Sequence, residues 1–167
     1  MDDCETMSKP AVKAPPNDLY ETDFYTWTQQ QARLLRERRW ADLDLENVAE
    51  EIETLGRSDK RQIESRLEIL IAHLLKWKYQ PGRRSASWTS TITQQRLKIK
   101  GLVKESPSLE RYPGKVFLDQ YLGARIEASK DTGIAFDLFP EECPFTIEEI
   151  LDVDFFPEEP GHIGAKE

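Results

Sequence analysis

Residues 43–81, LDLENVAEEIETLGRSDKRQIESRLEILIAHLLKWKYQP, carry the longest helical pattern in the chain. Apolar side chains recur every three or four residues, which is the spacing of one face of an α-helix; they are Val48, Ile52, Leu55, Ile63, Leu67, Leu70, Leu74 and Trp77. This stripe keeps its phase across Gly56, so the pattern predicts one helix of about 35 residues, roughly 50 Å long. Asp44 is the expected N-cap and Pro81 the expected end.

We expect the apolar stripe to be the buried side of this helix, and Gly56 and Asp59 fall on that side. A glycine there allows either a close crossing by another helix or a break in the helix. We favour a continuous helix, with Gly56 as the place for any bend.

The rest of the chain is also helical in pattern, and strand signals are weak throughout. Helices are expected at about 23–38, with Thr22 as N-cap and Phe24, Trp27, Gln31, Leu34 and Leu35 as the stripe, and at about 88–104, capped by Ser85 or Ser87. A further helix restarts at Pro113 and Gly114, runs to about Lys130 and ends before Gly133. Its expected buried residues are Phe117, Leu118, Tyr121, Leu122 and Ala124.

Residues 134–158, which we call the C-terminal strap, combine aromatic residues with a helix start signal. Thr146 and Glu149 have the spacing of a capping box, which predicts a short helix inside a largely extended segment. Five phenylalanines are expected to lie against the helices: Phe136, Phe139, Phe145, Phe155 and Phe156. The predicted fold is all-α, a bundle of four to five helices with one long amphipathic helix and a wrapped, partly extended C-terminal segment.

Composition and charge set bounds on the domain organisation and the compartment. The chain has 167 residues and a net charge of −8, and its length fits one domain with tails. Both ends lack apolar periodicity, so we expect a disordered leader over residues 1–17, one helical domain over 18–157 and a flexible tail over 158–167. Cys4 and Cys143 are the two cysteines, so a structural disulfide is not expected. The N-terminus lacks a signal-peptide pattern and the longest apolar run is Ile69–Ala72, so a soluble cytoplasmic protein is expected.

Four runs in this order resemble a known bacterial family: LYETDFYTWTQQQARLLRERR, the stretch quoted first, RSASWTSTITQQR and FPEECPFTIEEILDVDFFPE. They are similar to domain-of-unknown-function family twenty-nine over about Leu19 to Pro157. The resemblance implies an α-helical fold and no particular activity. Pro113 and Gly114 depart from the family, whose members tend to continue a helix there.

Candidates for catalysis or metal binding are few. Glu50 and Glu53 share one helix face, but His73 lies about 30 Å further along a continuous helix and would meet them only if a hairpin formed at Gly56. The alternative is an acidic, solvated face that suits a helix N-terminus. His73 is either a half-buried histidine bonded to a neighbouring helix or an acid–base residue at a pocket rim. No metal site, cofactor or catalytic motif is predicted.

A basic block occupies residues 69–104, which hold eight basic residues and no acidic one. The candidate contacts with an anionic partner are Lys76, Lys78, Arg83, Arg84, Arg96, Lys98 and Lys100, followed by Lys104. The helix expected at about 88–104 carries its cations away from its apolar stripe. If it lies beside the preceding helix, the cations of both could contact phosphates. The alternative is neutralisation by acidic segments of the same chain. Trp77 and Trp88 lie on apolar stripes, which favours the core for both.

Two functions are consistent with the sequence. The first is a non-catalytic interaction or regulatory module with a protein partner, in which the basic corner or the acidic N-terminal helix makes the contact. The alternative is nucleic-acid binding or hydrolysis by the basic hairpin of residues 76–104. The long helix would also suit a homodimer seam, because it outruns most small cores.

Overall fold

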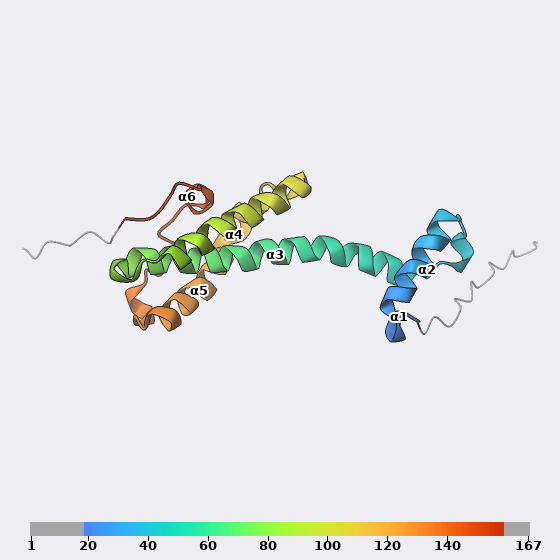
Figure 1. The fold of residues 1–167 in the computed structure, drawn as a ribbon, viewed down its shortest axis with the longest axis horizontal. Helices are drawn as coiled ribbons and strands as arrows, with labels where there is room; N and C mark the ends of the chain where they lie inside the picture. The colour runs from blue at the N-terminus through green and yellow to red at the C-terminus, as the bar shows by residue number, and fades with distance from the viewer. Residues whose placement is uncertain (1–18, 159–167) are drawn as a thin grey trace, which may run out of the picture. The chain divides into compact units, whose positions relative to one another are not determined.

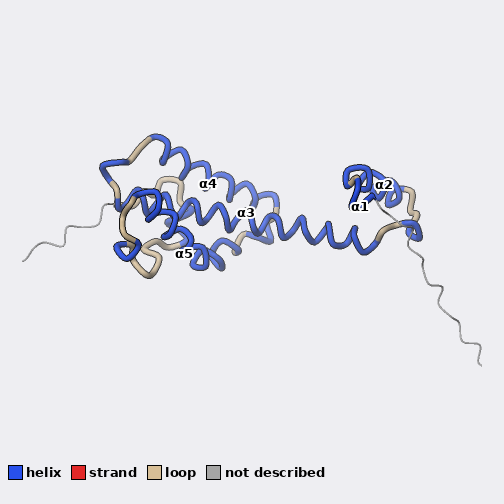
Figure 2. Tube along the Cα trace, turned by 90° about the horizontal axis from the view of Figure 1, so that it is seen from below, coloured by secondary structure: helices blue, strands red, loops and turns tan. Residues whose placement is uncertain are grey.

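The computed structural model describes residues 19–158, and within them all regular structure is helical (Figures 1 and 2). The helices are α1 (Leu19–Thr22), α2 (Phe24–Arg36), α3 (Leu45–Tyr79), α4 (Ala86–Glu105), α5 (Tyr112–Thr132) and α6 (Ile147–Leu151). Short 3-10 turns η1 to η4 lie at Trp40–Asp42, Pro81–Arg83, Pro107–Leu109 and Phe136–Leu138. The predicted all-α class is therefore confirmed. The predicted leader, 1–17, lies outside the described residues, as does the predicted tail apart from Glu158.

The chain divides into two compact units, Met1–Gly56 and Arg57–Glu167. In its described part the first unit contains α1, α2 and the start of α3. The second contains the rest of α3 with α4, α5, α6 and the C-terminal strap. The single domain expected over 18–157 stays a prediction. Within residues 19–158, no helix combines the length and the apolar character that a membrane crossing requires.

Helix α3 is one helix of 35 residues, as the hydrophobic pattern predicts. Its apolar stripe is nevertheless covered only in part. Ile52 is 63% exposed and Leu55 70% exposed, so the prediction that both belong to the core is wrong. Gly56 is exposed and no atom approaches the position of an added Cβ, so no helix crosses closely there. In the first unit, α2 lies beside the start of α3 but leaves Ile52 and Leu55 open to solvent.

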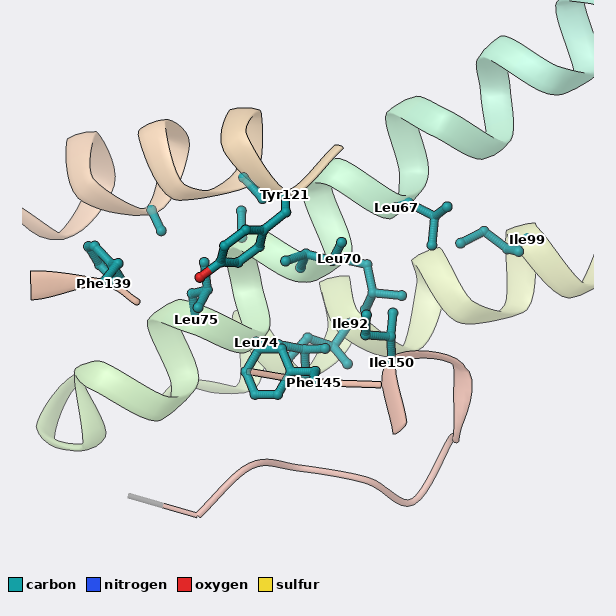
Figure 3. Packing of buried hydrophobic residues seen from close by; sticks show 14 of the residues in the cluster. Leu67, Leu70, Leu74, Leu75, Ile92, Ile99, Tyr121, Phe139, Phe145 and Ile150 are labelled. Atoms are coloured by element: carbon teal, nitrogen blue, oxygen red, sulfur yellow. The ribbon is translucent and has the colours of Figure 1, made fainter. Parts of the chain in front are cut away.

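The second unit has a continuous core built around the C-terminal half of α3 (Figure 3). Helix α4 and helix α5 lie along this half of α3 (Figures 1 and 2). The fully or almost fully buried apolar residues of this core are Ile63, Leu67, Leu70, Ile71, Ala72, Leu74 and Leu75 of α3, Ile92 and Ile99 of α4, Tyr121, Ala124 and Ala128 of α5, and Phe139, Phe145 and Ile150 of the strap. Four chain segments therefore share one core.

The helix ends follow from local hydrogen bonding. Asp23, rather than the predicted Thr22, caps α2, because its carboxylate accepts from the Thr26 backbone N–H at 3.0 Å. Helix α2 ends at Arg36 instead of Arg38, since Arg38 has a left-handed backbone with φ 57°. Ser85 caps α4, which therefore starts at Ala86, two residues before the prediction.

Three other boundary predictions are confirmed. Pro113 lies in the first turn of α5, where its missing N–H costs nothing. Gly133 ends α5 with φ 72°, and Thr146 and Glu149 form the predicted capping box of α6. The buried face of α5 is confirmed at Tyr121 and Ala124, but Leu118 and Leu122 are exposed. The face turned to the core continues with Arg125, Ala128 and Thr132 instead.

The C-terminal strap lies against the helices as expected. Phe139 and Phe145 are buried, and Phe155 and Phe156 pack on the same core. Phe136 lies 4.1 Å from the Arg125 guanidinium of α5, measured to the ring centroid. The strap is therefore part of the fold's hydrophobic core.

We expect Leu74→Ala to lower the free energy of unfolding by about 2–5 kcal/mol, because Leu74 is fully buried and the truncation leaves a cavity. The measurement is urea unfolding followed by circular dichroism. Leu97→Ala on α4 is the control, since Leu97 is 56% exposed and should cost less than about 0.5 kcal/mol. Equal losses for the two variants would contradict the assignment of the core.

Candidate functional site

His73 lies half-buried on α3, and its environment disfavours the charged imidazole. Its Nδ1 is 2.9 Å from the Ile69 carbonyl oxygen one turn earlier, so its hydrogen-bond partner is its own helix and not the predicted neighbouring helix. Burial lowers the pKa of His73, and Lys76 adds to that effect, while the Ile69 carbonyl, Asp131 and Glu127 act in the opposite direction. A neutral imidazole with Nδ1–H donating to Ile69 is the form that this site stabilises.

Glu50 and Glu53 are exposed residues of the first unit. Helix α3 has no hairpin at Gly56, which was the condition for bringing these carboxylates to His73. Within residues 19–158, no group of three or more His, Cys, Asp or Glu side chains is placed to hold a metal ion.

Two cations of the basic block are buried in the fold. The Lys76 ammonium lies 2.7 Å from an Asp131 carboxylate oxygen and 5.0 Å from the centroid of the Trp88 ring. Arg96 is only 2% exposed. Its guanidinium donates to four strap carbonyls, those of Ile150 (2.8 Å), Phe155 (2.8 Å), Val153 (3.4 Å) and Glu149 (3.4 Å). The expectation that Arg96 lies away from the buried face of its helix is therefore wrong, because the strap covers it.

The other cations of the block do not form one surface. Arg84 donates through Nε to the Trp77 carbonyl at 3.0 Å and stacks over the Trp77 ring. Lys78 lies over the Phe145 ring, 5.7 Å from its centroid. Arg83, Lys98, Lys100 and Lys104 are exposed.

Lys98 and Lys100 line two different hollows. Lys98 faces a hollow between α3 and α4, together with Arg61 and Arg66 of α3. Lys100 faces another, beside Glu110 and Asp152. Sequence reasoning did not find Arg61 and Arg66, because both precede the acid-free stretch of residues 69–104 by which the basic block was defined.

An apolar groove of about 340 Å³ runs between α2 and the start of α3, and we call it the α2–α3 groove. Its lining residues are Phe24, Trp27, Thr28, Gln31, Ala32 and Leu35 of α2, and Val48, Glu51, Ile52 and Leu55 of α3. Four of them are large apolar side chains that face solvent: Phe24 is 48%, Leu35 40%, Ile52 63% and Leu55 70% exposed. These residues are visible in the sequence as apolar stripes, but we interpreted the stripes as buried core. For that reason the groove was not predicted from the sequence.

Hydrogen bonds fix the floor of the α2–α3 groove. The Trp27 indole N–H donates to an Asp44 carboxylate oxygen at 3.2 Å, and the Gln31 side-chain oxygen accepts from the Asp44 backbone N–H at 3.0 Å. The Tyr20 hydroxyl donates to Glu51 at 2.7 Å, and this bond to a carboxylate raises the pKa of Tyr20 to about 12. The loop before α3 therefore holds α2 in place.

The α2–α3 groove belongs to an acidic unit. Residues 19–56 contain nine acidic and four basic side chains, a net charge of −5. Glu46, Glu50 and Glu53 follow the i, i+4, i+7 spacing of one helix face on α3, on the side away from Val48, Ile52 and Leu55. The groove is therefore an apolar surface, with Glu51 as its one lining carboxylate, in a unit of net negative charge.

Comparison with known proteins places this chain in a family. A family model described as "Domain of unknown function DUF29" matches residues 19–156. No curated protein and no solved structure matches the chain at a significant level.

The environment of His73 predicts a pKa below the ordinary 6.5 in the folded protein. Because the unfolded chain then binds a proton more readily, the contribution of His73 to stability is complete above pH 6.5 and is lost as the pH falls towards the folded pKa. Titration by NMR of the ring protons measures this value, with His162, the other histidine, as the internal comparison. A folded pKa above 6.5 for His73 would contradict the dominance of burial.

We expect Arg96→Met to lower the free energy of unfolding by about 3 kcal/mol, because hydrogen bonds from a charged donor contribute about 1.5–3 kcal/mol and the strap carbonyls lose theirs. Limited proteolysis should cut the strap of the Arg96→Met variant, within residues 149–156, sooner than that of the wild type. Lys100→Met is the matched control, since Lys100 is an exposed cation of the same helix. A strap equally resistant in the two variants would rule out the role assigned to Arg96.

Proposed function

The chain belongs to the DUF29 family, and we propose that it is a non-catalytic interaction module whose α2–α3 groove binds an amphipathic helix of a partner protein. The bound helix would carry an apolar stripe facing the groove and basic side chains along its flanks. The exposed apolar floor of the groove is the observation that carries this proposal.

The first unit has little core of its own. The buried apolar residues among 19–56 are Trp27, Leu34 and Leu43, while four other large apolar side chains, which line the groove, face solvent. Units of about 40 residues rarely bury enough surface to be stable alone. Covering the groove would remove apolar area from water at about 25 cal/mol per Å², so a bound helix would stabilise this unit.

The shape and charge of the groove favour one kind of occupant. Two packed helices form its walls, and a third helix can place side chains at i, i+4 and i+7 between them. The unit has a net charge of −5, so a second copy would bring a like charge, whereas Lys and Arg flanks would be attracted to the acidic unit. Glu51, the groove's one lining carboxylate, already accepts from Tyr20. The lining therefore suits binding better than acid–base chemistry.

Nucleic-acid binding is the alternative, and the exposed cations Arg83, Lys98 and Lys100 favour it. Lys76 and Arg96 are engaged inside the fold, which leaves fewer groups for phosphate contacts than the sequence suggests. We therefore give the protein-binding function priority.

We expect the full chain to bind a synthetic 20-residue helical peptide with Leu along one face and Lys on both flanks. Isothermal titration calorimetry should show this peptide binding at least about ten times more tightly than one with Glu flanks, because the latter brings like charge to an acidic unit. Ile52→Asp should weaken binding at least about tenfold, roughly 1.4 kcal/mol, because it places a charge on the apolar floor.

Leu118→Asp on α5 is the matched control for Ile52→Asp, since the two side chains are 61% and 63% exposed. It should leave peptide binding unchanged. Equal binding of both peptides, or indifference to Ile52→Asp, would sink the proposal. A dimer of the chain alone that Ile52→Asp dissociates in sedimentation would instead show that a second copy fills the groove.

A further inference from the structure

A second hollow, of about 440 Å³, lies between α3 and α4 in the second unit. Three cations line it, Arg61 and Arg66 from α3 and Lys98 from α4, together with the hydroxyls of Ser58 and Ser65. None of its lining residues is acidic. We propose that this hollow binds the phosphate group of a small phosphorylated molecule.

The acidic side chains of the same stretch of α3 are committed elsewhere. Glu64 accepts a hydrogen bond from the Tyr112 hydroxyl, and Asp59 accepts one from Ser106 at 3.4 Å. The Glu68 carboxylate lies against Gly123 of α5, close enough that an added Cβ there would be 2.7 Å from it. Within residues 19–158, no carboxylate lies within ion-pair distance of Arg61, Arg66 or Lys98. Their positive charge therefore faces the hollow uncompensated.

Arg66 is short of acceptors. Its two terminal nitrogens make long bonds of 3.4 Å, one to the side-chain oxygen of Gln95 and one to that of Gln62. Its Nε–H is buried and has no acceptor among the described residues. A buried charged donor without an acceptor is costly, so this side chain is set up for an anionic oxygen supplied from outside the chain.

The donor set fits a phosphate better than a carboxylate. Donors converge from two helices and comprise two guanidinium groups, one ammonium and two hydroxyls, whereas a carboxylate is planar and singly charged. A tetrahedral phosphate offers three or more acceptor oxygens in different directions and up to two negative charges. The hollow is larger than one phosphate, and the Ile69 side chain in its lining provides apolar contact for an attached organic group.

A small molecule suits the hollow better than a nucleic acid. A bound strand needs a continuous track of cations along its backbone. Lys100, two residues after Lys98, faces a different hollow that also contains Glu110 and Asp152. The positive charge around Arg66 is therefore local. This site is separate from the α2–α3 groove, and it does not depend on the function proposed for that groove.

The test is to titrate the full chain, at constant ionic strength, with inorganic phosphate, glycerol phosphate and acetate, following backbone amides by NMR. We expect glycerol phosphate to bind at least as tightly as inorganic phosphate and at least about ten times more tightly than acetate. Lys98→Gln and Arg61→Gln should each weaken phosphate binding at least about fivefold, because each removes one charge from the hollow.

Lys104→Gln is the control, since Lys104 is an exposed cation of α4 outside the hollow, and it should bind as the wild type does. The exposed Lys98 and Arg61 variants decide the test, because substitution of the partly buried Arg66 could disturb the fold. Acetate binding as tightly as phosphate, or a loss no larger in Lys98→Gln than in Lys104→Gln, would overturn the proposal. So would a 12-nucleotide single strand that binds more tightly than glycerol phosphate and needs Lys100 as well as Lys98.

Discussion

Helix α3 is buried on most sides around residues 70–75, and the second unit is organised by the need to cover this stretch. Leu70, Ile71, Ala72, Leu74 and Leu75 have no exposed surface, so neighbours must surround the helix at this level. A single packed helix covers only one stripe of another. Helices α4 and α5 cover part of α3, and the strap contributes Phe139, Phe145 and Ile150 to the same core (Figure 3).

Covering a helix with an irregular segment creates a second requirement, since the backbone carbonyls of the strap must be paired when they are buried. Arg96 meets it at one end of the strap with four carbonyl contacts. At the other end, Arg125 donates to the Phe139 carbonyl at 3.0 Å, and Tyr121 donates to that of Pro140 at 2.7 Å. Part of the positive charge that makes the sequence resemble an anion-binding protein therefore serves the strap.

The hydrophobic period and the capping residues of a helix are local features of the sequence. Helix lengths and helix ends, which depend on them, were therefore predictable. The length of α3, its end before Pro81 and the capping box of α6 follow from neighbouring residues alone. Periodicity shows which side of a helix is apolar but not whether anything covers that side, so Ile52 and Leu55 were misplaced. The face of α5 failed for the same reason at Leu118 and Leu122.

The candidate sites depend on contacts between distant segments, which local patterns do not contain. Arg96 reads as a surface cation until the strap, more than 50 residues later, is placed over it. The hollow lined by Arg61, Arg66 and Lys98 forms only when α3 and α4 pack in one particular register. The hydrogen bond from Arg66 to Gln95, 29 residues later in the chain, reflects that register. The groove residues were visible in the sequence as an apolar stripe. The sequence does not show that, within residues 19–158, no third helix covers this stripe, which is why these residues line an open groove instead of a core.

The central claim is that one continuous helix has a covered half and an open half. Native-state hydrogen exchange along α3 tests it directly, because amide protection follows the local free energy of opening. The account predicts amides of residues 63–79 exchanging only with global unfolding, and those of residues 45–56 exchanging at least about a hundredfold faster. Uniformly slow exchange from residue 45 to residue 79 in the free chain would contradict it, since the apolar face of the first unit would then already be covered.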